Sequence, residues 1–205
     1  PFSPLRFPFF YGWCIVIFTT LGMIASIPGQ TMGVGVYTDF LIQNSHLTRM
    51  QISMAYMTGT ILSSLLLPLA GRYYDLVGGR IMIVFAGIGM GISLLLFAES
   101  LTIIHLVHSL LPNISILTSE LLVITLIFLL LRQFGQGIMA MVSRNTLAKW
   151  FDRRRGMVSG ISGIFVAFSF SGAPLFMNII IEDYGYSGSM ILMAIIFGFG
   201  MAFIG

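Results

Sequence analysis

The sequence predicts an all-α polytopic membrane protein, and three observations carry this prediction. Of the 205 residues, 57% are hydrophobic and only 8% are charged, whereas a soluble domain carries about a quarter charged residues. The mean hydropathy is +0.99. Long uncharged runs alternate with short charged segments, and no stretch shows the alternating polarity over about ten residues that a barrel strand needs. The composition therefore suits a lipid environment.

Six apolar runs are long enough to cross a bilayer as helices, since a spanning helix needs about 20 apolar residues. The expected spans are residues 9–38, 50–71, 80–99, 120–146, 156–181 and 185–205. Two of them contain glycine pairs four residues apart, Gly87 with Gly91 and Gly156 with Gly160. Small residues at this spacing allow two helices to approach closely, so we expect both pairs to lie at helix–helix contacts.

The basic residues are distributed unevenly between the connections. One set of connections contains Arg6, Arg72, Arg80, Arg144, Lys149, Arg153, Arg154 and Arg155, and the other contains Arg49 with Asp39, Glu99, Glu120, Glu182 and Asp183. The positive-inside rule makes the first set cytoplasmic. Both ends of the chain are therefore expected on the cytoplasmic side of a cell membrane. The net charge of +3 then reflects topology, and we expect a lipid bilayer and no nucleic acid as partner.

Residues 100–119 are apolar but contain His105, His108, a proline and an asparagine. The segment either extends the third span or lies as an interfacial helix on the outer side. Two histidines alone are a weak signal for a metal, and the single cysteine, Cys14, excludes a disulfide within the chain. We expect no metal and no cofactor.

The connection between the second and third spans reads Gly71-Arg72-Tyr73-Tyr74-Asp75-Leu76-Val77-Gly78-Gly79-Arg80. Its glycines permit a tight turn between helices, and Asp75 can cap a helix start or pair with a nearby arginine. The order Gly, three residues, Asp, two residues, Gly, one residue, Arg resembles the cytoplasmic signature of the major facilitator superfamily. The position of the motif, between spans two and three on the inner side, matches that family too.

Two further stretches extend the resemblance. The fourth span contains Arg132 and downstream glycines, and the sequence Trp150-Phe151 with a basic cluster and Gly156 leads into the fifth span. This pattern and the opening Tyr11-Gly12-Trp13 are similar to the monocarboxylate and oxalate/formate-type branches. The resemblance implies the amino-terminal six-helix half of a two-half bundle, with the carboxy-terminal half missing from this chain. It also implies a conformational role for the cytoplasmic residues Gly71, Arg72, Asp75, Gly78, Arg80 and Arg144.

Arg132 lies near the middle of the fourth span. A charge at the bilayer centre costs at least about 2.5 kcal/mol, so we expect it to face a cavity or a partner. Gln136 at i+4 and Ser143 about three turns on are expected on the same helix face, which predicts a polar stripe. Two interpretations stay open: Arg132 contacts substrate, or it bonds exposed backbone of the first span. A guanidinium matches the two oxygens of a carboxylate, so the first interpretation favours an organic anion.

The first span contains the stretch Ser26-Ile27-Pro28-Gly29-Gln30-Thr31. Pro28 removes a helical hydrogen bond and Gly29 loosens the next turn, which predicts a break in the helix. Such a break survives at membrane depth only beside a cavity or under other protein. We expect Gln30 and Thr31 to face the transport pathway; the alternative is a packing kink in which a neighbouring helix satisfies Gln30.

The favoured function is a secondary active transporter that moves a small solute, such as a monocarboxylate, by alternating access. The expected pathway residues are Gln30, Thr31, Tyr56, Arg132, Gln136 and Asn178. The alternatives are a transporter of a neutral or drug-like solute with a purely structural Arg132, and a non-transporting scaffold or sensor. We expect no enzyme, because no span holds a carboxylate pair or a histidine base.

Overall fold

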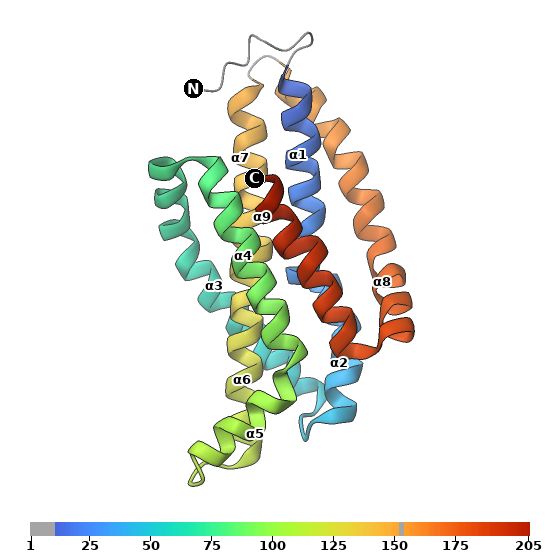
Figure 1. Cartoon of the computed structure of the whole chain (residues 1–205). Helices are drawn as coiled ribbons and strands as arrows, with labels where there is room; N and C mark the ends of the chain where they lie inside the picture. Colours follow the sequence, from blue (N-terminus) through green and yellow to red (C-terminus); the bar gives the residue numbers. More distant parts are fainter. Residues whose placement is uncertain (1–10, 152–153) are drawn as a thin grey trace.

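The computed structural model describes residues 11–151 and 154–205, which form a bundle of roughly antiparallel helices (Figure 1). The helices are α1 (Gly12–Ala25), α2 (Thr31–Asn44), α3 (Arg49–Val77), α4 (Gly79–Ala98), α5 (Ser100–Leu110), α6 (Ile116–Leu131), α7 (Ala140–Trp150), α8 (Arg155–Met193) and α9 (Gly200–Ile204). A 3₁₀ turn, η2 (Ile27–Gly29), and two π-helical segments, η3 (Arg132–Met139) and η4 (Ala194–Phe199), connect some of them. Arg6, Arg153 and the first two residues of the span expected at 9–38 lie outside the described residues.

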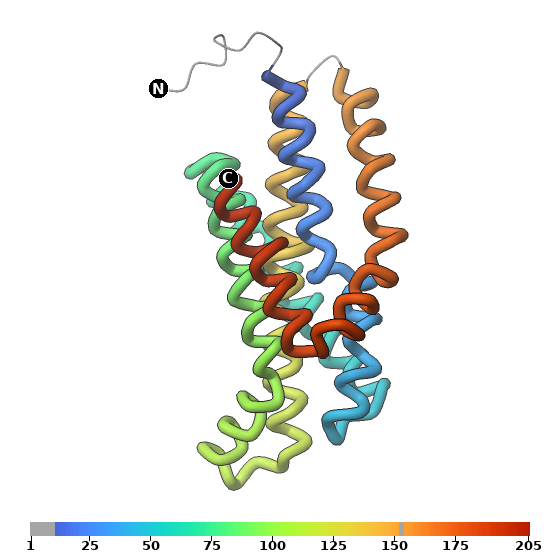
Figure 2. The backbone as a smooth tube through the Cα atoms, turned by 45° about the vertical axis from the view of Figure 1, so that its right-hand side comes forward, coloured from blue at the N-terminus to red at the C-terminus, as the bar shows by residue number. Residues whose placement is uncertain are grey.

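Within the described residues, four helical stretches are long and apolar enough to cross a membrane: Arg49–Val77, Gly79–Ala98, Ile116–Trp150 and Arg155–Ile204. The last of these is not one straight helix, because Gly185 has φ 70° and ψ 176°. A positive φ is readily adopted by glycine, and the chain turns back near this point (Figure 2). The protein is therefore an all-α integral membrane protein.

The turn between α3 and α4 is shorter than the sequence analysis predicted. Helix α3 continues to Val77 and α4 begins at Gly79, so Gly78, with φ 83°, is the single residue between them. Gly71 and Asp75 therefore lie inside α3, and Asp75 does not cap a helix start. The charge pattern marks where apolar sequence ends, but a helix can continue past that point because its backbone bonds are made internally.

Residues 100–119 do not continue α4 as a straight helix. Glu99, with φ −98° and ψ 17°, separates α4 from α5, and α5 packs against α6. The hydroxyl of Ser115 accepts a hydrogen bond from the backbone N–H of Thr118 at 3.3 Å, which caps the amino end of α6. The segment therefore contains the separate short helix α5, at one end of the bundle, and the start of α6 (Figure 1).

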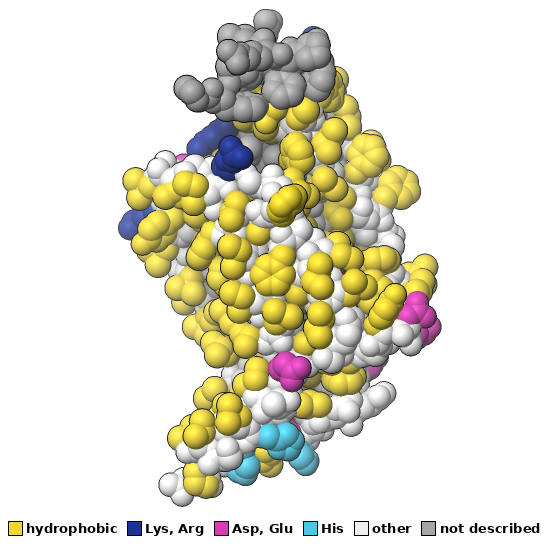
Figure 3. Space-filling model, viewed as in Figure 1, with side chains coloured by type: hydrophobic (Ala, Val, Ile, Leu, Met, Phe, Trp, Pro, Cys, Tyr) yellow, Lys and Arg dark blue, Asp and Glu magenta, His cyan; other side chains and the backbone are white. Residues whose placement is uncertain are grey.

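The charged residues mark the two ends of the bundle. On the face shown in Figure 3, lysine and arginine side chains lie at the end where α7 finishes, and histidines lie at the opposite end. We call these the basic end and the histidine end. The rings of Trp13 and Phe151 are 6.3 Å apart, and Arg80 Nε donates to the Gly205 carbonyl at 2.8 Å. The start of α1 and the end of α9 therefore lie toward the basic end.

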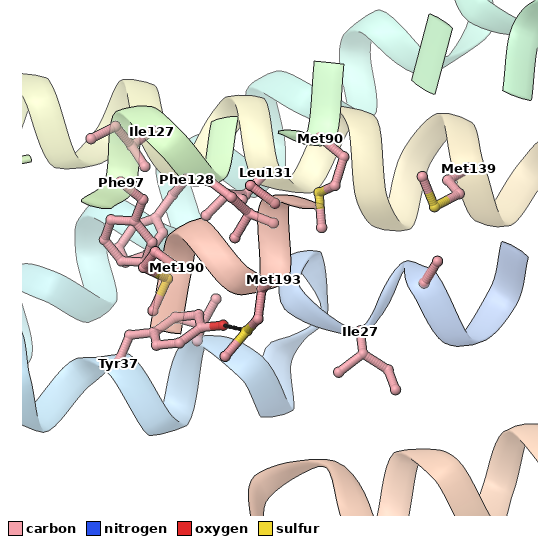
Figure 4. Packing of buried hydrophobic residues seen from close by; sticks show 14 of the residues in the cluster. Ile27, Tyr37, Met90, Phe97, Ile127, Phe128, Leu131, Met139, Met190 and Met193 are labelled. Carbon is pink, nitrogen blue, oxygen red and sulfur yellow. Dashed lines mark hydrogen bonds between the residues drawn. The ribbon is translucent and has the colours of Figure 1, made fainter. Parts of the chain in front are cut away.

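Buried rings from several helices form an aromatic cluster, which we define as Tyr37, Phe97, Phe128 and Tyr186 (Figure 4 shows the first three). Tyr37 and Phe97 meet edge to face at 5.2 Å between centroids, and Phe97 and Phe128 lie 5.8 Å apart. The Tyr37 hydroxyl donates to Met193 Sδ at 3.3 Å. Such ring pairs add to the free energy of simple area burial, so the cluster ties α2, α4, α6 and α8 together.

One of the two glycine pairs lies at a close helix contact. A Cβ on Gly87 would lie 2.7 Å from the Gly198 carbonyl oxygen, and a Cβ on Gly198 would overlap Gly91. The close approach predicted for Gly87 and Gly91 is therefore confirmed, and η4 is the partner. The prediction for Gly156 and Gly160 is wrong for the described residues, because no neighbouring heavy atom lies within 4 Å of the position a Cβ would take.

Candidate functional site

The first span changes conformation in the middle of the bundle. Ile27–Gly29 form the single 3₁₀ turn η2, Gln30 is extended with φ −89° and ψ 161°, and α2 begins at Thr31. The N–H groups of Gly33 and Val34 both donate to the Gln30 carbonyl, at 3.1 and 3.2 Å. The N–H groups of Thr31 and Met32 precede the first helical bond, so the break presents the amino end of α2, with its partial positive charge, inside the bundle.

A second irregular segment packs directly on this break. Residues Arg132–Met139 of the fourth span are π-helical, a conformation that is rare and concentrated at functional sites. A Cβ on Gly29 would overlap the Leu131 carbonyl oxygen and lie 3.0 Å from Gly135 Cα. Glycine at positions 29 and 135 therefore lets the two backbones touch, which brings the start of η3 against η2.

Arg132 bridges the two segments. Its Nη1 donates to the Gly29 carbonyl at 3.4 Å, and its guanidinium carbon lies 5.3 Å from the centroid of the Tyr56 ring. The side chain thus makes the backbone contact that the sequence analysis held open as an alternative. The bond is long for an N–H···O contact, the guanidinium carries five N–H donors, and the residue is only half-buried. Most of its donors therefore stay available to a ligand.

Thr31 and Tyr56 complete what we call the Arg132 cluster: Arg132, Tyr56, Thr31 and the Gly29 carbonyl. The Tyr56 hydroxyl and Thr31 Oγ1 are 2.9 Å apart, and the Tyr56 ring meets Phe128 edge to face at 5.6 Å. Three of the residues expected to line the pathway therefore come together from α2, α3 and η3. Cation–π contact with Tyr56 partly compensates the charge of Arg132.

Other expected pathway residues lie elsewhere. Gln30 is only 8% exposed, and its Nε2 donates to Ser26 Oγ at 3.0 Å, so this partner lies in the first span itself and not, as the alternative expected, on a neighbouring helix. Gln136 is exposed on η3, and Asn178 is exposed on α8. No hydrogen bond or ion pair between described residues joins either side chain to the Arg132 cluster.

The residues of the predicted polar stripe, Arg132, Gln136 and Ser143, differ in exposure: Arg132 is half-buried, Gln136 is exposed and Ser143 is buried. Ser143 is 2% exposed and lies against Gly22 of α1, where a Cβ would overlap its hydroxyl. The physical reason is the π-helical segment, in which hydrogen bonds run i to i+5, so the phase of the side chains shifts between Arg132 and α7. Helix-period arithmetic therefore cannot be carried across that segment.

Sequence reasoning missed a polar contact beside Arg132. Gln133 is 8% exposed, and its Oε1 accepts a hydrogen bond from Ser63 Oγ at 2.9 Å. This bond joins α3 to η3. The usable signal was a second amide directly after an intramembrane arginine, since a buried amide needs partners.

The cytoplasmic signature residues lie at the basic end but pair differently from expectation. Asp75 Oδ1 is 3.4 Å from Lys149 Nζ, so its partner is a lysine of α7 and not an arginine. Lys149 Nζ also lies 4.3 Å from the centroid of the Tyr74 ring. Arg72 and Arg144 are exposed and form no ion pair with another described residue. The end of α3 is thus tied to α7 by exposed contacts.

A buried carboxylate lies toward the histidine end. Glu120 accepts hydrogen bonds from the backbone N–H of His46 at 3.1 and 3.2 Å, and its Oε1 is 2.8 Å from His46 Nδ1. The exposed fractions of the two side chains are 4% for Glu120 and 73% for His46. Among the described residues, no three His, Cys, Asp or Glu side chains gather in a way that could hold a metal ion.

Comparison with known families gave one match. The family model described as Major Facilitator Superfamily matches residues 13–205. A comparison with curated proteins and one with solved structures each found no match. The matched range includes the Arg132 cluster, the α3–α4 turn and every helix from α2 onward.

Proposed function

The chain belongs to the major facilitator superfamily, and on this premise we propose that it is a secondary active transporter that moves a small organic anion, such as a monocarboxylate, across a cell membrane by alternating access. Membership by itself supports a membrane transporter in general. The Arg132 cluster supports the choice of an anion, and the likeness of Tyr11-Gly12-Trp13 and Trp150-Phe151 to the monocarboxylate and oxalate/formate-type branches supports a carboxylate.

In this proposal the chain crosses the bilayer six times and forms the amino-terminal half of the transporter. Helices α1 and α2 together make the first span, and Gly185 divides the fifth span from the sixth. The basic end is cytoplasmic, in keeping with the positive-inside rule. A second six-helix half, absent from this sequence, would close the pathway from the other side.

One observation carries the choice of an organic anion. A half-buried guanidinium, whose one hydrogen bond to the described residues is long, lies beside the interrupted first span, whose second helix starts at Thr31. The amino end of a half-helix carries partial positive charge and free N–H groups, which favour an anion. The hydroxyls of Tyr56 and Thr31 add polar groups that a carboxylate oxygen can use. Arg132 would supply the bidentate contact.

The cytoplasmic signature would act as the movable latch. In this proposal the signature residues all lie at the basic end: Gly71, Arg72, Asp75, Gly78, Arg80 and Arg144. An exposed ion pair such as Asp75 with Lys149 is worth at most about 1 kcal/mol. Such a contact can therefore open and close without a large free-energy change, which alternating access requires.

The test is solute uptake by the full-length protein in proteoliposomes, with wild type, Arg132→Gln and Arg132→Lys in parallel. Labelled monocarboxylates, dicarboxylates, neutral solutes and cations would be compared. We expect uptake of a carboxylate by the wild type, little uptake by Arg132→Lys and loss of uptake in Arg132→Gln, because a lysine ammonium lacks the fork of donors. Carboxylate uptake at wild-type rate in Arg132→Gln would refute the anion site.

A second candidate is a transporter of a neutral or drug-like solute in which Arg132 is purely structural. The hydrogen bond to the Gly29 carbonyl and the contact with the Tyr56 ring favour it. It predicts that Arg132→Gln lowers the melting temperature of the protein but leaves the solute profile unchanged. If no solute moves in any sample while the protein is folded, a scaffold or sensor is the better description.

A further inference from the structure

A polar concavity lies toward the basic end, between α1, α7 and α8. It has a volume of about 330 Å³, and we call it the inner cleft. Its polar lining residues are Thr19, Ser143, Arg144, Arg155, Ser159 and Ser162. None of them belongs to the Arg132 cluster, so the inner cleft is a separate feature of the molecule.

Two arginines and no described carboxylate line the inner cleft. Arg144 lies on α7 and Arg155 is the first residue of α8, and no described acidic residue lines the space. Elsewhere the described cations Arg49 and Lys149 each pair with an aspartate, Asp39 and Asp75. Two like charges in one cleft repel each other, and an anion between them would turn repulsion into attraction.

The lining also contains a polar group that lacks a partner. Ser143 is 2% exposed, and its hydroxyl has no hydrogen-bond partner among the described residues. The neighbouring hydroxyls are satisfied: Ser162 Oγ is 2.8 Å from Thr20 Oγ1, and Thr19 Oγ1 donates to the Ile15 carbonyl at 2.7 Å. A buried donor without an acceptor is costly, and an anionic oxygen in the cleft would provide that acceptor.

We propose that the inner cleft is a binding site for an oxyanion, either the carboxylate or phosphate of a small solute or the phosphate of an anionic lipid headgroup. Arg144 and Arg155 supply the charge, Ser143 and Ser159 supply hydroxyl donors, and the amino end of α8 adds partial positive charge. The site depends on its own residues, and it stands whether or not Arg132 contacts the transported solute.

The first test measures anion binding to the full-length protein in phosphatidylcholine nanodiscs by calorimetric titration. Oxalate and inorganic phosphate are the probes, at constant ionic strength, and Arg132→Gln is the background so that the Arg132 cluster does not contribute. We expect Arg144→Gln and Arg155→Gln each to weaken binding at least about tenfold, because each removes a charge-assisted bond. Arg154→Gln is the matched control, since Arg154 is exposed and adjacent but does not line the cleft.

A lipid arm separates the two sources of the oxyanion. If a headgroup is the occupant, discs that contain phosphatidylglycerol raise the melting temperature of the Arg132→Gln background and lose that effect with Arg155→Gln, while soluble anions bind poorly in either disc. If a solute is the occupant, the soluble anions bind in phosphatidylcholine alone. The proposal is overturned if neither oxalate, phosphate nor phosphatidylglycerol has an effect that depends more on Arg144 or Arg155 than on Arg154.

A thiol-protection measurement keeps the proposal testable if the arginine variants fail to fold. Ser159→Cys would be made in a Cys14→Ser background and labelled with a small maleimide. We expect oxalate, phosphate or phosphatidylglycerol to slow labelling of Ser159→Cys but not of Ser53→Cys, an exposed position on α3 outside the cleft. Equal labelling rates with and without every probe would overturn the proposal.

Discussion

The histidine end and the basic end of this bundle are built differently. Toward the first, α2, α4, α6 and α8 meet in the aromatic cluster, and Glu120 is buried against His46. At the second, arginines line the inner cleft and exposed contacts such as Asp75 with Lys149 join the helices. The buried core runs through both ends, so the ends differ in their polar groups: a buried carboxylate beside packed aromatic rings at one, and exposed arginines available to a ligand at the other. The Arg132 cluster lies at the break in the first span, between them.

The largest effect is expected when the aromatic cluster is opened. Phe97 is fully buried and contacts Tyr37, Phe128 and Tyr186. Phe97→Ala should lower the free energy of unfolding by about 3–5 kcal/mol, because it removes buried area and leaves a cavity. Denaturant titration in detergent, followed by circular dichroism, measures this. Phe203→Ala is the control, since Phe203 is 94% exposed; equal losses in the two variants would contradict the comparison between the ends.

A smaller effect is expected at the contact between η2 and η3. Gly29→Ala places a methyl group on the Leu131 carbonyl oxygen, so the two segments must separate, at a cost of about 1–3 kcal/mol. Gly35→Ala is a matched control on α2, where nothing lies within 4 Å. Melting temperature and carboxylate uptake should both fall for Gly29→Ala and not for Gly35→Ala. A Gly29→Ala protein that matches wild type in both would show that the contact is unimportant.

A smaller loss of stability is expected when the charge of Glu120, the buried carboxylate near the histidine end, is removed. Glu120→Gln keeps one oxygen acceptor for the His46 N–H but removes the charge, so we expect a loss of about 1 kcal/mol. The exposed carboxylate of Glu99, which accepts from Thr102 Oγ1 at 3.1 Å, provides the comparison. Chemical denaturation should show a lower free energy of unfolding for Glu120→Gln than for Glu99→Gln. If Glu99→Gln were the more damaging of the two, the assignment of stability to buried contacts would fail.

The smallest effect is expected at the basic end. Asp75→Asn breaks an exposed ion pair with Lys149, and such pairs contribute about 0–1 kcal/mol. The melting temperature should therefore change little, and the residual change should vanish at high salt. Its effect on transport is the more informative readout, because a latch alters rates without altering stability. A large loss of stability in Asp75→Asn would contradict the conclusion that the exposed contacts of the basic end contribute little to the free energy of unfolding.

The local features of the candidate site were predictable, and the backbone of the first span was one of the two partners left open for Arg132; the sequence could not decide between them. Pro28 and Gly29 predict an interruption of the helix because proline lacks an N–H and glycine lacks a Cβ. Arg132 is recognisable as a charged residue inside an apolar run. Its contact with the Gly29 carbonyl lies 103 residues away in the chain, and periodicity carries no information on that distance. The partner of Gln30, Ser26, is only four residues away, but that bond forms because the helix is interrupted between α1 and α2.

The sequence by itself determined that this protein is helical and lies in a membrane, because lipid offers backbone groups no partners and long apolar runs must satisfy them within a helix. The tertiary structure decided which faces meet. It placed Gly87 and Gly91 at a contact and left Gly156 and Gly160 open, although the two patterns are identical. It also paired Asp75 with Lys149 and gathered Arg144 and Arg155 around one cleft. These outcomes depend on helix rotation and on the π-helical phase shift, which are set by packing between distant segments.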